Sequence, residues 1–540
     1  MKANKKEILL AGTLSFLLTF MHVAGWQLSM EYGSSVHQSA FFQNIGILSP
    51  LGCLLWGILE FTALSIVIYH TFRFLTKRSS GHLEHTGSPD PVANHIVGWG
   101  TFIIMSILWL IFLWGCYPGY YNYDVGNQLP QFLYEEVPYN SHHPLLHTLL
   151  LGSIASFGYR IHTADISFGI FLYNAFQMIV CAGCLNYSLR YIYKQTRRRL
   201  ITMIAFCFYT FCPSIVMFAM CTTKDILCFS FLLVGIIRFM ELVEQINLGK
   251  TPGKIHWCSV GLFWLLSCLL RNNIAYALVL FIPFTLLLLR KEYTKQFLLY
   301  LGVLAAYFLI NKSLLIALDA TPGSFNEAMC VPYQQIAALY TQEGENAFTP
   351  KELDLLSQAI PPNELFTNDP VMGDSIKSNF LPGLETIMAN KWDYFSLWLK
   401  KGFQYPHIYI KAFLYKNYQA WYPGTALVDK NGPRYFDITD WQIEYGSPHW
   451  QGLYDFYAAI RYNEYTALPV LRLLLSIGTM FWMTLVTWFY GIHRGNKSII
   501  LPLLLVLLVC ITNFCGPVSD VRYYLILFYL FPVCIGCLTK

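Results

Sequence analysis

Residues 200–243 read LITMIAFCFYTFCPSIVMFAMCTTKDILCFSFLLVGIIRFMELV, two apolar runs with a short polar segment between them. A helix needs about 20 predominantly apolar residues to cross the hydrocarbon core of a bilayer. The runs 200–220 and 225–243 are each near that length. The stretch therefore predicts two membrane-spanning helices that are joined by a polar turn at one membrane boundary.

The composition of the whole chain agrees with this prediction. The chain has 540 residues, of which 55% are hydrophobic and 12% charged, and its mean hydropathy is +0.44. Soluble proteins carry about 25% charged residues, and disordered chains combine low hydrophobicity with high charge. Both classes are therefore excluded. The net charge of +5 is small for a chain of this length, so no nucleic-acid partner is expected.

Twelve apolar runs are candidate membrane spans. Basic residues precede the first run and no small-residue cleavage site follows it, so we expect a retained helix rather than a removed signal peptide. The expected fold class is an all-α polytopic membrane protein with about twelve transmembrane helices. The expected spans are residues 8–29, 46–71, 98–117, 165–189, 200–220, 225–243, 256–271, 274–290, 297–317, 466–490, 499–514 and 523–539.

Basic residues are unevenly divided between the two sides of these spans. If the N-terminus is inside, the short inner segments hold 19 Lys or Arg and the short outer segments hold four. Cytoplasmic loops carry such an excess, so we expect both termini to be cytoplasmic. The inner segments are 1–7, 72–97, 190–199, 244–255, 290–296, 491–498 and residue 540. The outer basic residues are Arg160, Lys224, Arg271 and Arg522.

This orientation divides the chain into four expected parts. They are a two-span segment with a cytoplasmic linker (1–97), a membrane core with the outer loop 118–164 (98–317), an extracytoplasmic loop or domain (318–465) and a three-span segment (466–540). The 318–465 loop is too long to lack structure of its own, and its Trp and Tyr content predicts that part of it lies at the membrane surface. Within 118–164 we expect surface helices, with 145–158 along the interface. Residues 79–95 are the expected flexible linker.

Polar residues gather in short clusters at the ends of the spans. All of these clusters fall on the outer side in this topology. Charged groups near lipid are costly and tend to mark function, so we expect one site at the outer membrane boundary. The clusters are residues 117–128, 141–147, 222–225, 271–273, 331–335 and 516–524.

Asp124 follows a Pro-Gly break at the end of the third expected span. If the chain then becomes helical, Asn127 and Gln128 lie at i+3 and i+4 on the same face. A carboxylate beside two amides can orient a hydroxyl or an amine and remove its proton. The alternative is a helix N-cap, a position that Asp also favours.

The run His142-His143-Pro144-Leu145-Leu146-His147 places His143 and His147 at i and i+4. On one helical face they would be a candidate metal pair, with Glu135 or Glu136 as a third ligand. Contact with an anionic or sugar ligand and structural hydrogen bonding are the alternatives.

Three cations lie near the outer boundary. Lys224 opens a span beside Asp225, where a helix N-terminus favours anions, and Arg271 and Arg522 can bind phosphate oxygens bidentately. Together they fit a lipid-linked phosphate. The alternatives are a local ion pair and interfacial contact with lipid headgroups.

These pieces resemble the GT-C superfamily of integral membrane glycosyltransferases, and more closely a bacterial family of uncharacterised multi-pass membrane proteins near that superfamily. The matching pieces are Pro118-Gly119 with Asp124 and Gln128, His142-His143-Pro144 with His147-Thr148, Lys224-Asp225, Arg271-Asn272-Asn273, Pro332 with Gln334-Gln335-Ile336-Ala337, and Arg522-Tyr523. The first two spans lie outside the resemblance. The usual acidic dipeptide is absent around Asp124, and the large loop has no WWDYG motif.

The resemblance implies transfer of a sugar from a polyprenyl-phosphate donor to an acceptor outside the bacterial cytoplasmic membrane. Asp124 would be the general base, and Lys224, Arg271 and Arg522 would hold the donor phosphate. The acceptor would be an envelope glycan, lipid or protein, and no cofactor is assigned, although a divalent metal stays open. The expected substrate-binding residues are Asn127, Gln128, His142, His143, His147, Lys224, Asp225, Arg271, Asn272, Gln334, Gln335, Arg522 and Tyr523.

The main competing hypothesis is a polytopic transporter or lipid flippase, which would place polar groups near the bilayer midplane. A membrane acyltransferase that uses the histidines is another. The glycosyltransferase hypothesis requires Asp124, Lys224, Arg271 and Arg522 to line one outward cavity, whereas scatter of these residues around the bundle would exclude it.

Overall fold

The computed structural model of the chain describes residues 5–33, 49–80, 96–162, 166–366, 369–424, 448–461 and 469–539. The expected linker at 79–95 lies outside the described residues from residue 81 onward. Parts of the expected 318–465 loop, residues 425–447 among them, also lie outside them.

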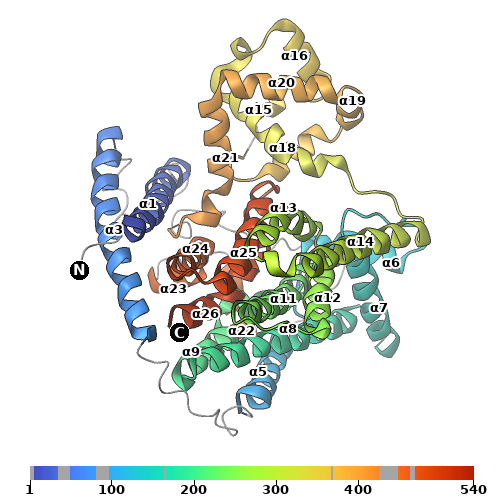
Figure 1. The fold of residues 1–540 in the computed structure, drawn as a ribbon. Helices are drawn as coiled ribbons and strands as arrows, with labels where there is room; N and C mark the ends of the chain where they lie inside the picture. Colours follow the sequence, from blue (N-terminus) through green and yellow to red (C-terminus); the bar gives the residue numbers. More distant parts are fainter. Residues whose placement is uncertain are drawn as a thin grey trace.

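Long apolar helices form a bundle that occupies the lower part of Figure 1. Their apolar runs exceed what a soluble helix carries, so the chain is a helical membrane protein. The bundle elements are α1 (Lys5–Gly33), α3 (Pro50–Ser80), η1 (Ile96–Gly100), α5 (Thr101–Gly115), α8 (Ser167–Thr196), α9 (Arg199–Phe211), α10 (Pro213–Ala219), α11 (Lys224–Asn247), α12 (Lys254–Leu270), α13 (Asn272–Leu288), η2 (Arg290–Glu292), α14 (Tyr293–Ala317), α23 (Pro469–Leu475), α24 (Ile477–Arg494), α25 (Lys497–Phe514), η7 (Val521–Tyr524) and α26 (Leu525–Thr539).

Eight helices of the described residues are long and apolar enough to cross a membrane, or nine if the bent pair α9 and α10 is one span. This is fewer than the twelve predicted. The segment 200–220 is broken by a 50° bend before Pro213, and α12 and α13 have 17 residues each, below the length that a span usually needs. The count of twelve therefore stays a prediction.

The centre of the bundle is α11, which packs against α8, α12, α25 and α26. Within its apolar window 83% of the residues are buried, against 6% for α3. A helix that is apolar on all sides is stable where protein or lipid covers it. Helix α3, together with α1, stands at the left edge of the bundle in Figure 1 and presents most of its surface outward.

A second group of helices lies at one end of the bundle, at the top of Figure 1, and α21 leads from it back to the bundle. It has a hydrophobic core of its own, drawn from residues 333–409. We call this group the outer domain, after its expected position outside the membrane. Its elements are η3 (Phe325–Met329), α15 (Cys330–Glu343), η4 (Gly344–Ala347), α16 (Pro350–Ser357), α17 (Pro362–Leu365), α18 (Gly373–Phe380), α19 (Leu384–Ala389), α20 (Lys391–Gln404) and α21 (Pro406–Trp421), and α22 (Gln451–Arg461) lies after it in the chain.

Two short strands connect distant parts of the bundle. β1 (Tyr120–Tyr121) pairs in parallel with β2 (Cys221–Thr222). Side chains of α8 hold both strands, since Asn174 Nδ2 donates to the carbonyl of Pro118 and Gln177 Nε2 donates to that of Ala219. Gly119 has φ +100°, and a Cβ there would lie 2.4 Å from Asn174 Nδ2. The close approach and the positive φ both require glycine.

The segment predicted as the first outer loop contributes α6 (Tyr123–Leu133) and α7 (Leu145–Ile161). Val125 and Leu129 of α6 pack with Leu151 of α7 and Tyr173 of α8 in a small separate core. Neither helix is among the candidate spans.

Candidate active site

The strand pair places two helix N-termini side by side. Tyr121 of β1 is in register with Thr222 of β2. Helix α6 begins two residues after Tyr121, and α11 begins two residues after Thr222. Each helix is capped by a polar side chain, because Asn122 accepts from the Asp124 amide and Thr223 accepts from the Asp225 amide. Asp124 and Lys224 therefore enter the same site.

Asp124 is surrounded by cationic side chains. Its carboxylate pairs with the Lys224 ammonium, and Arg522 Nη1 lies 3.2 Å from the same oxygen, Oδ2. His143 Nδ1 lies 3.8 Å from it. Arg522 Nη1 also donates to Asn122 Oδ1 at 2.6 Å. Residues 400 positions apart in the chain thus meet at the first turn of α6.

A second ion pair adjoins the first. The Arg271 guanidinium pairs with Asp225, and its Nε donates to Asn273 Oδ1 at 3.1 Å. Arg271 Cζ and Arg522 Cζ lie over the Tyr523 ring, 4.5 and 4.7 Å from its centroid, so the ring joins the two guanidinium groups through cation–π contacts. Arg522 Nη2 also donates to the Tyr523 hydroxyl at 2.9 Å.

The charges of this cluster are balanced. Its three cations face three carboxylates, because Asp520 Oδ2 lies 3.2 Å from Arg522 Nε. We call the set the charged cluster: Asp124, His143, Lys224, Asp225, Arg271, Asp520, Arg522 and Tyr523. Four helical N-termini, those of α6, α11, α13 and η7, contribute its residues. A helix N-terminus carries a partial positive charge that favours anions, so the ends of α6, α11 and α13 add such charge beside a cluster whose side chains sum to zero.

Burial alone would raise the pKa of Asp124, but Arg522 and Lys224 hold it well below the ordinary range. The group is therefore an ionised carboxylate, and it is a weak base as long as both cations pair with it. The expected role of Asp124 as a base requires that these contacts change.

Burial and the positive charge of Lys224 lower the pKa of His143 well below its ordinary value, so the imidazole is neutral. Lys224 Nζ lies 3.3 Å from its Nδ1, which accepts from the ammonium. The proton then resides on Nε2, which is buried and has no hydrogen-bond partner among the described residues. A buried donor without a partner is costly, and it is suited to a ligand oxygen.

His147 makes hydrogen bonds that connect neighbouring helices. Its Nδ1 donates to Gln128 Oε1 at 3.1 Å and its Nε2 accepts from the Tyr173 hydroxyl at 2.7 Å, while Gln128 Nε2 donates to Thr148. Burial lowers the pKa of His147 to about 3. The neutral ring therefore links α6, α7 and α8.

The candidate metal pair is not formed on one helical face. Helix α7 begins at Leu145, so His143 precedes it and does not share a helical face with His147. Glu135 and Glu136, the proposed third ligands, are exposed. In the part of the chain that the structure describes, no three His, Cys, Asp or Glu side chains are grouped as metal ligands.

The two amides expected beside Asp124 lie elsewhere. Gln128 faces α7 and is buried in the His147 network. Asn127 is exposed on α6. The helical spacing was correctly predicted, but ion pairs rather than amides surround the Asp124 carboxylate.

Gln334 and Gln335 do not reach the charged cluster. They are buried in the outer domain, where Gln334 Nε2 donates to the carbonyl of Pro370 and Gln335 Nε2 to that of Tyr409. Asn272 lies beside Arg271, and its Oδ1 accepts from the Tyr307 hydroxyl. His142 faces Glu327, whose carboxylate is 3.8 Å away.

Four residues that complete the site were not among the expected site residues: Asn122, Asn273 and Asp520, which lie within the polar clusters of the sequence, and Tyr173, which lies outside them. Asn122 could have been found as an N-cap directly before an acidic first turn. The pairing of Asp520 with Arg522, two positions apart, has no periodic signal.

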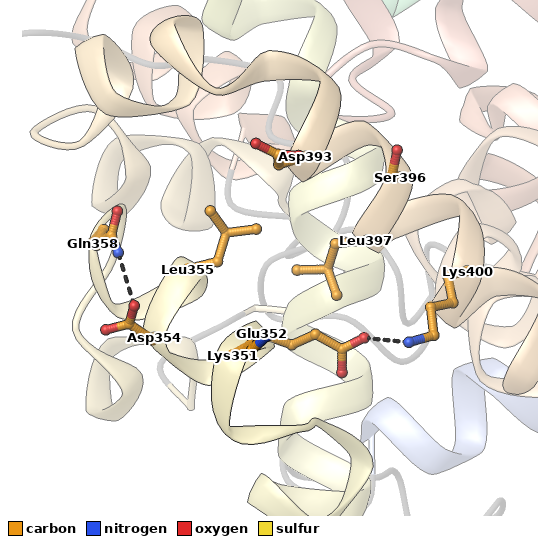
Figure 2. Close-up of a pocket in the computed structure, with 9 residues that line it drawn as sticks. All are labelled: Lys351, Glu352, Asp354, Leu355, Gln358, Asp393, Ser396, Leu397 and Lys400. Carbon is orange, nitrogen blue, oxygen red and sulfur yellow. Dashed lines mark hydrogen bonds and ion pairs between the residues drawn. The ribbon is translucent and has the colours of Figure 1, made fainter.

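The outer domain contains a separate hollow of about 500 Å³ between α16 and α20 (Figure 2). Glu352 accepts from Lys400 at 2.8 Å within it and also caps α16 through the Thr349 amide. Burial opposes ionisation of Glu352, yet Lys400 and Lys401 hold its pKa at about 2. These contacts fasten α16 to α20, and none of the predicted site residues lines the hollow.

Most of the chain matches one known protein family. Residues 135–539 match the model of a family described as "Family of unknown function (DUF6020)". The chain belongs to this family. The match covers Lys224, Arg271 and Arg522 and begins shortly after Asp124. No curated protein and no solved structure matches the chain.

Proposed function

We propose that this DUF6020 protein is a membrane glycosyltransferase that moves a sugar from a polyprenyl-phosphate donor to an acceptor on the outer side of a bacterial cytoplasmic membrane. The observation that carries the proposal is the meeting of Asp124, Lys224, Arg271 and Arg522 in one cluster at the ends of the bundle helices. They come from four separate parts of the chain, and the GT-C resemblance requires them to be together.

The leaving group explains the cations. When the bond between the sugar and the phosphate oxygen breaks, the lipid phosphate departs with both bonding electrons. Lys224, Arg271, Arg522 and the electropositive N-termini stabilise this growing negative charge. Guanidinium groups bind phosphate oxygens in pairs, and their cation–π contacts with Tyr523 hold them in place.

Donor binding also accounts for the ion-paired state of Asp124. A phosphate competes with this carboxylate for Lys224 and Arg522, and each contact that moves to the phosphate raises the pKa of Asp124 toward its ordinary value. The released carboxylate takes the proton of the acceptor hydroxyl while the acceptor oxygen bonds to the sugar. Donor binding thus precedes activation of the acceptor.

The test is turnover of purified wild type, Asp124→Asn and Asp393→Asn with a panel of polyprenyl-phosphate sugars, followed by release of free lipid phosphate. Asp393→Asn is the matched control, because it makes the same substitution at an exposed Asp of α20 that is not part of the charged cluster. We expect turnover by wild type, retention of most of it by Asp393→Asn, and a loss of at least about 10³-fold in Asp124→Asn.

Equal turnover by wild type and Asp124→Asn would remove Asp124 as the base. If no donor is turned over and the protein instead moves labelled lipid phosphate across a vesicle bilayer, the flippase hypothesis takes the place of the transferase.

A further inference from the structure

A cavity of about 530 Å³ lies on the exposed side of α6, next to the charged cluster. Its inner wall is the face of α6 that carries Asn127, Pro130, Gln131 and the following Tyr134, at i, i+3, i+4 and i+7. The opposite face of α6 packs on α7 and α8 through Val125 and Leu129. Helix α6 therefore separates a packed core from an open cavity.

The outer wall is the segment 322–324, which directly precedes the outer domain. It is joined to the first outer loop by main-chain contacts: Ser141 N donates to the carbonyl of Thr321, and Thr321 N donates to that of Tyr139. Gly323 N donates to Ser141 Oγ at 2.9 Å. Gln131 Oε1 accepts from Asn140 N at 3.0 Å and closes the floor. These hydrogen bonds hold both walls in place.

The lining is polar but carries no formal charge. No Asp, Glu, Lys or Arg is among the described residues that line it. Its polar side chains are Asn127, Gln131, Asn140, His142 and Ser324, together with the Tyr134 ring, which is 57% exposed. A phosphate or a charged peptide would need opposite charges there, and an acyl chain would need an apolar lining. Amides bind hydroxyl pairs through a donor and an acceptor at once, and an aromatic ring packs on the apolar face of a pyranose.

The cavity also lies close to the reacting groups. The His142 ring in its lining is 4.5 Å, centroid to centroid, from the His143 ring of the charged cluster. Asn127 is one helical turn from Asp124 on α6. The cavity and the charged cluster are therefore neighbours, connected through the His142 and His143 rings and through α6.

We propose that this cavity binds the acceptor and that the acceptor is a neutral saccharide. The proposal rests on the proposed function for the word acceptor, but saccharide binding itself requires neither donor nor turnover. Tyr134 supplies the stacking surface, and Asn127 contacts the hydroxyl groups, while the amide of Gln131 stays bonded to the main chain at the floor. Asp124 then receives the proton of the hydroxyl that becomes glycosylated.

The experiment is saturation-transfer NMR on the full-length protein in detergent. The probes are neutral di- to tetrasaccharides of glucose, galactose, mannose and N-acetylglucosamine, compared with sulfated and uronic-acid oligosaccharides of the same length. The variants are Tyr134→Ala and Asn127→Ala. Tyr159→Ala is the matched control, since Tyr159 is an exposed tyrosine of α7 that does not line the cavity.

We expect at least one neutral saccharide to bind wild type and Tyr159→Ala equally, and Tyr134→Ala and Asn127→Ala at least tenfold more weakly. The proposal is overturned if no neutral saccharide binds, if only the anionic probes bind, or if both cavity variants bind as wild type does. Saccharide binding without turnover of any donor would support the cavity and count against the transferase. Turnover that transfers sugar to a protein or lipid acceptor, with no saccharide binding, would support the transferase and overturn the proposal for the cavity.

Discussion

Asp124 and Lys224 form one ion pair but are expected to act in opposite directions on an anionic ligand. Removal of the carboxylate leaves Lys224 and Arg522 available to a phosphate. We expect Asp124→Asn to bind a polyprenyl phosphate about tenfold more tightly than wild type, and Lys224→Met to bind it at least tenfold more weakly, where tenfold corresponds to about 1.4 kcal/mol. Equilibrium binding of a fluorescent polyprenyl phosphate measures both changes.

The control for this pair is thermal melting of each variant, because breaking a buried ion pair costs about 3–5 kcal/mol when one charge is left alone. Arg522 still neutralises part of Asp124 in Lys224→Met, so both variants should stay folded. Weaker phosphate binding by a well-folded Asp124→Asn protein would contradict the competition between carboxylate and phosphate.

His147 makes the stability of the chain depend on pH. Its pKa is about 3 in the folded protein and about 6.5 when unfolded. Between these values the unfolded state binds the proton and the folded state does not, so stability falls as the pH falls, by about 1.4 kcal/mol per pH unit well below pH 6.5. We expect His147→Gln to be less stable than wild type at pH 8, with a smaller further loss between pH 7 and 5. Urea unfolding at each pH measures the slope, and identical slopes for the two proteins would exclude neutral His147.

At the scale of elements, the crossing of α7 and α8 depends on small residues. A Cβ on Gly169 of α8 would lie 2.2 Å from the carbonyl oxygen of Ala155 in α7. Gly169→Val should therefore separate the helices, break the hydrogen bond between His147 and Tyr173, and destabilise the protein by about 3 kcal/mol. Gly302→Val in α14 is the matched control, because no atom lies within 4 Å of its Cβ position. Equal melting temperatures for the two variants would contradict this packing.

Much of the element order was predictable, since long apolar runs have few alternatives to helices in a membrane. The gathering of Asp124, Lys224 and Arg522 followed from their common position at span ends. That these residues form ion pairs with one another did not follow from the sequence, because contacts between residues of α6, α11 and η7 produce no periodic pattern in it. Gln334 was assigned to the site for its polarity, yet its amide serves the carbonyls of the outer domain. Local sequence cannot distinguish a ligand-binding amide from one that satisfies buried main-chain groups.

At the scale of the whole molecule, the charged cluster and the outer domain lie toward the same end of the bundle. The cluster is built at the N-termini of α11 and α13, and the outer domain follows the C-terminus of α14 (Figure 1). Successive antiparallel helices end on alternate sides of the bundle, so the C-terminus of α14 lies on the same side as the N-termini of α11 and α13. The outer domain and the site are therefore on the same side of the membrane. One measurement of the orientation of the chain therefore shows on which side of the membrane the outer domain and the charged cluster lie.

The distribution of Lys and Arg predicts that this side is outside. We expect a cysteine introduced by Ser357→Cys, exposed on α16, to react with a membrane-impermeant maleimide in intact cells. Lys250→Cys, exposed after the opposite end of α11, should react only after the membrane is permeabilised. Mass spectrometry separates these sites from the native cysteines, and the buried Cys510 serves as the unreactive control. The reverse pattern would place the charged cluster in the cytoplasm, where a lipid-linked donor would have to be presented from the inner leaflet.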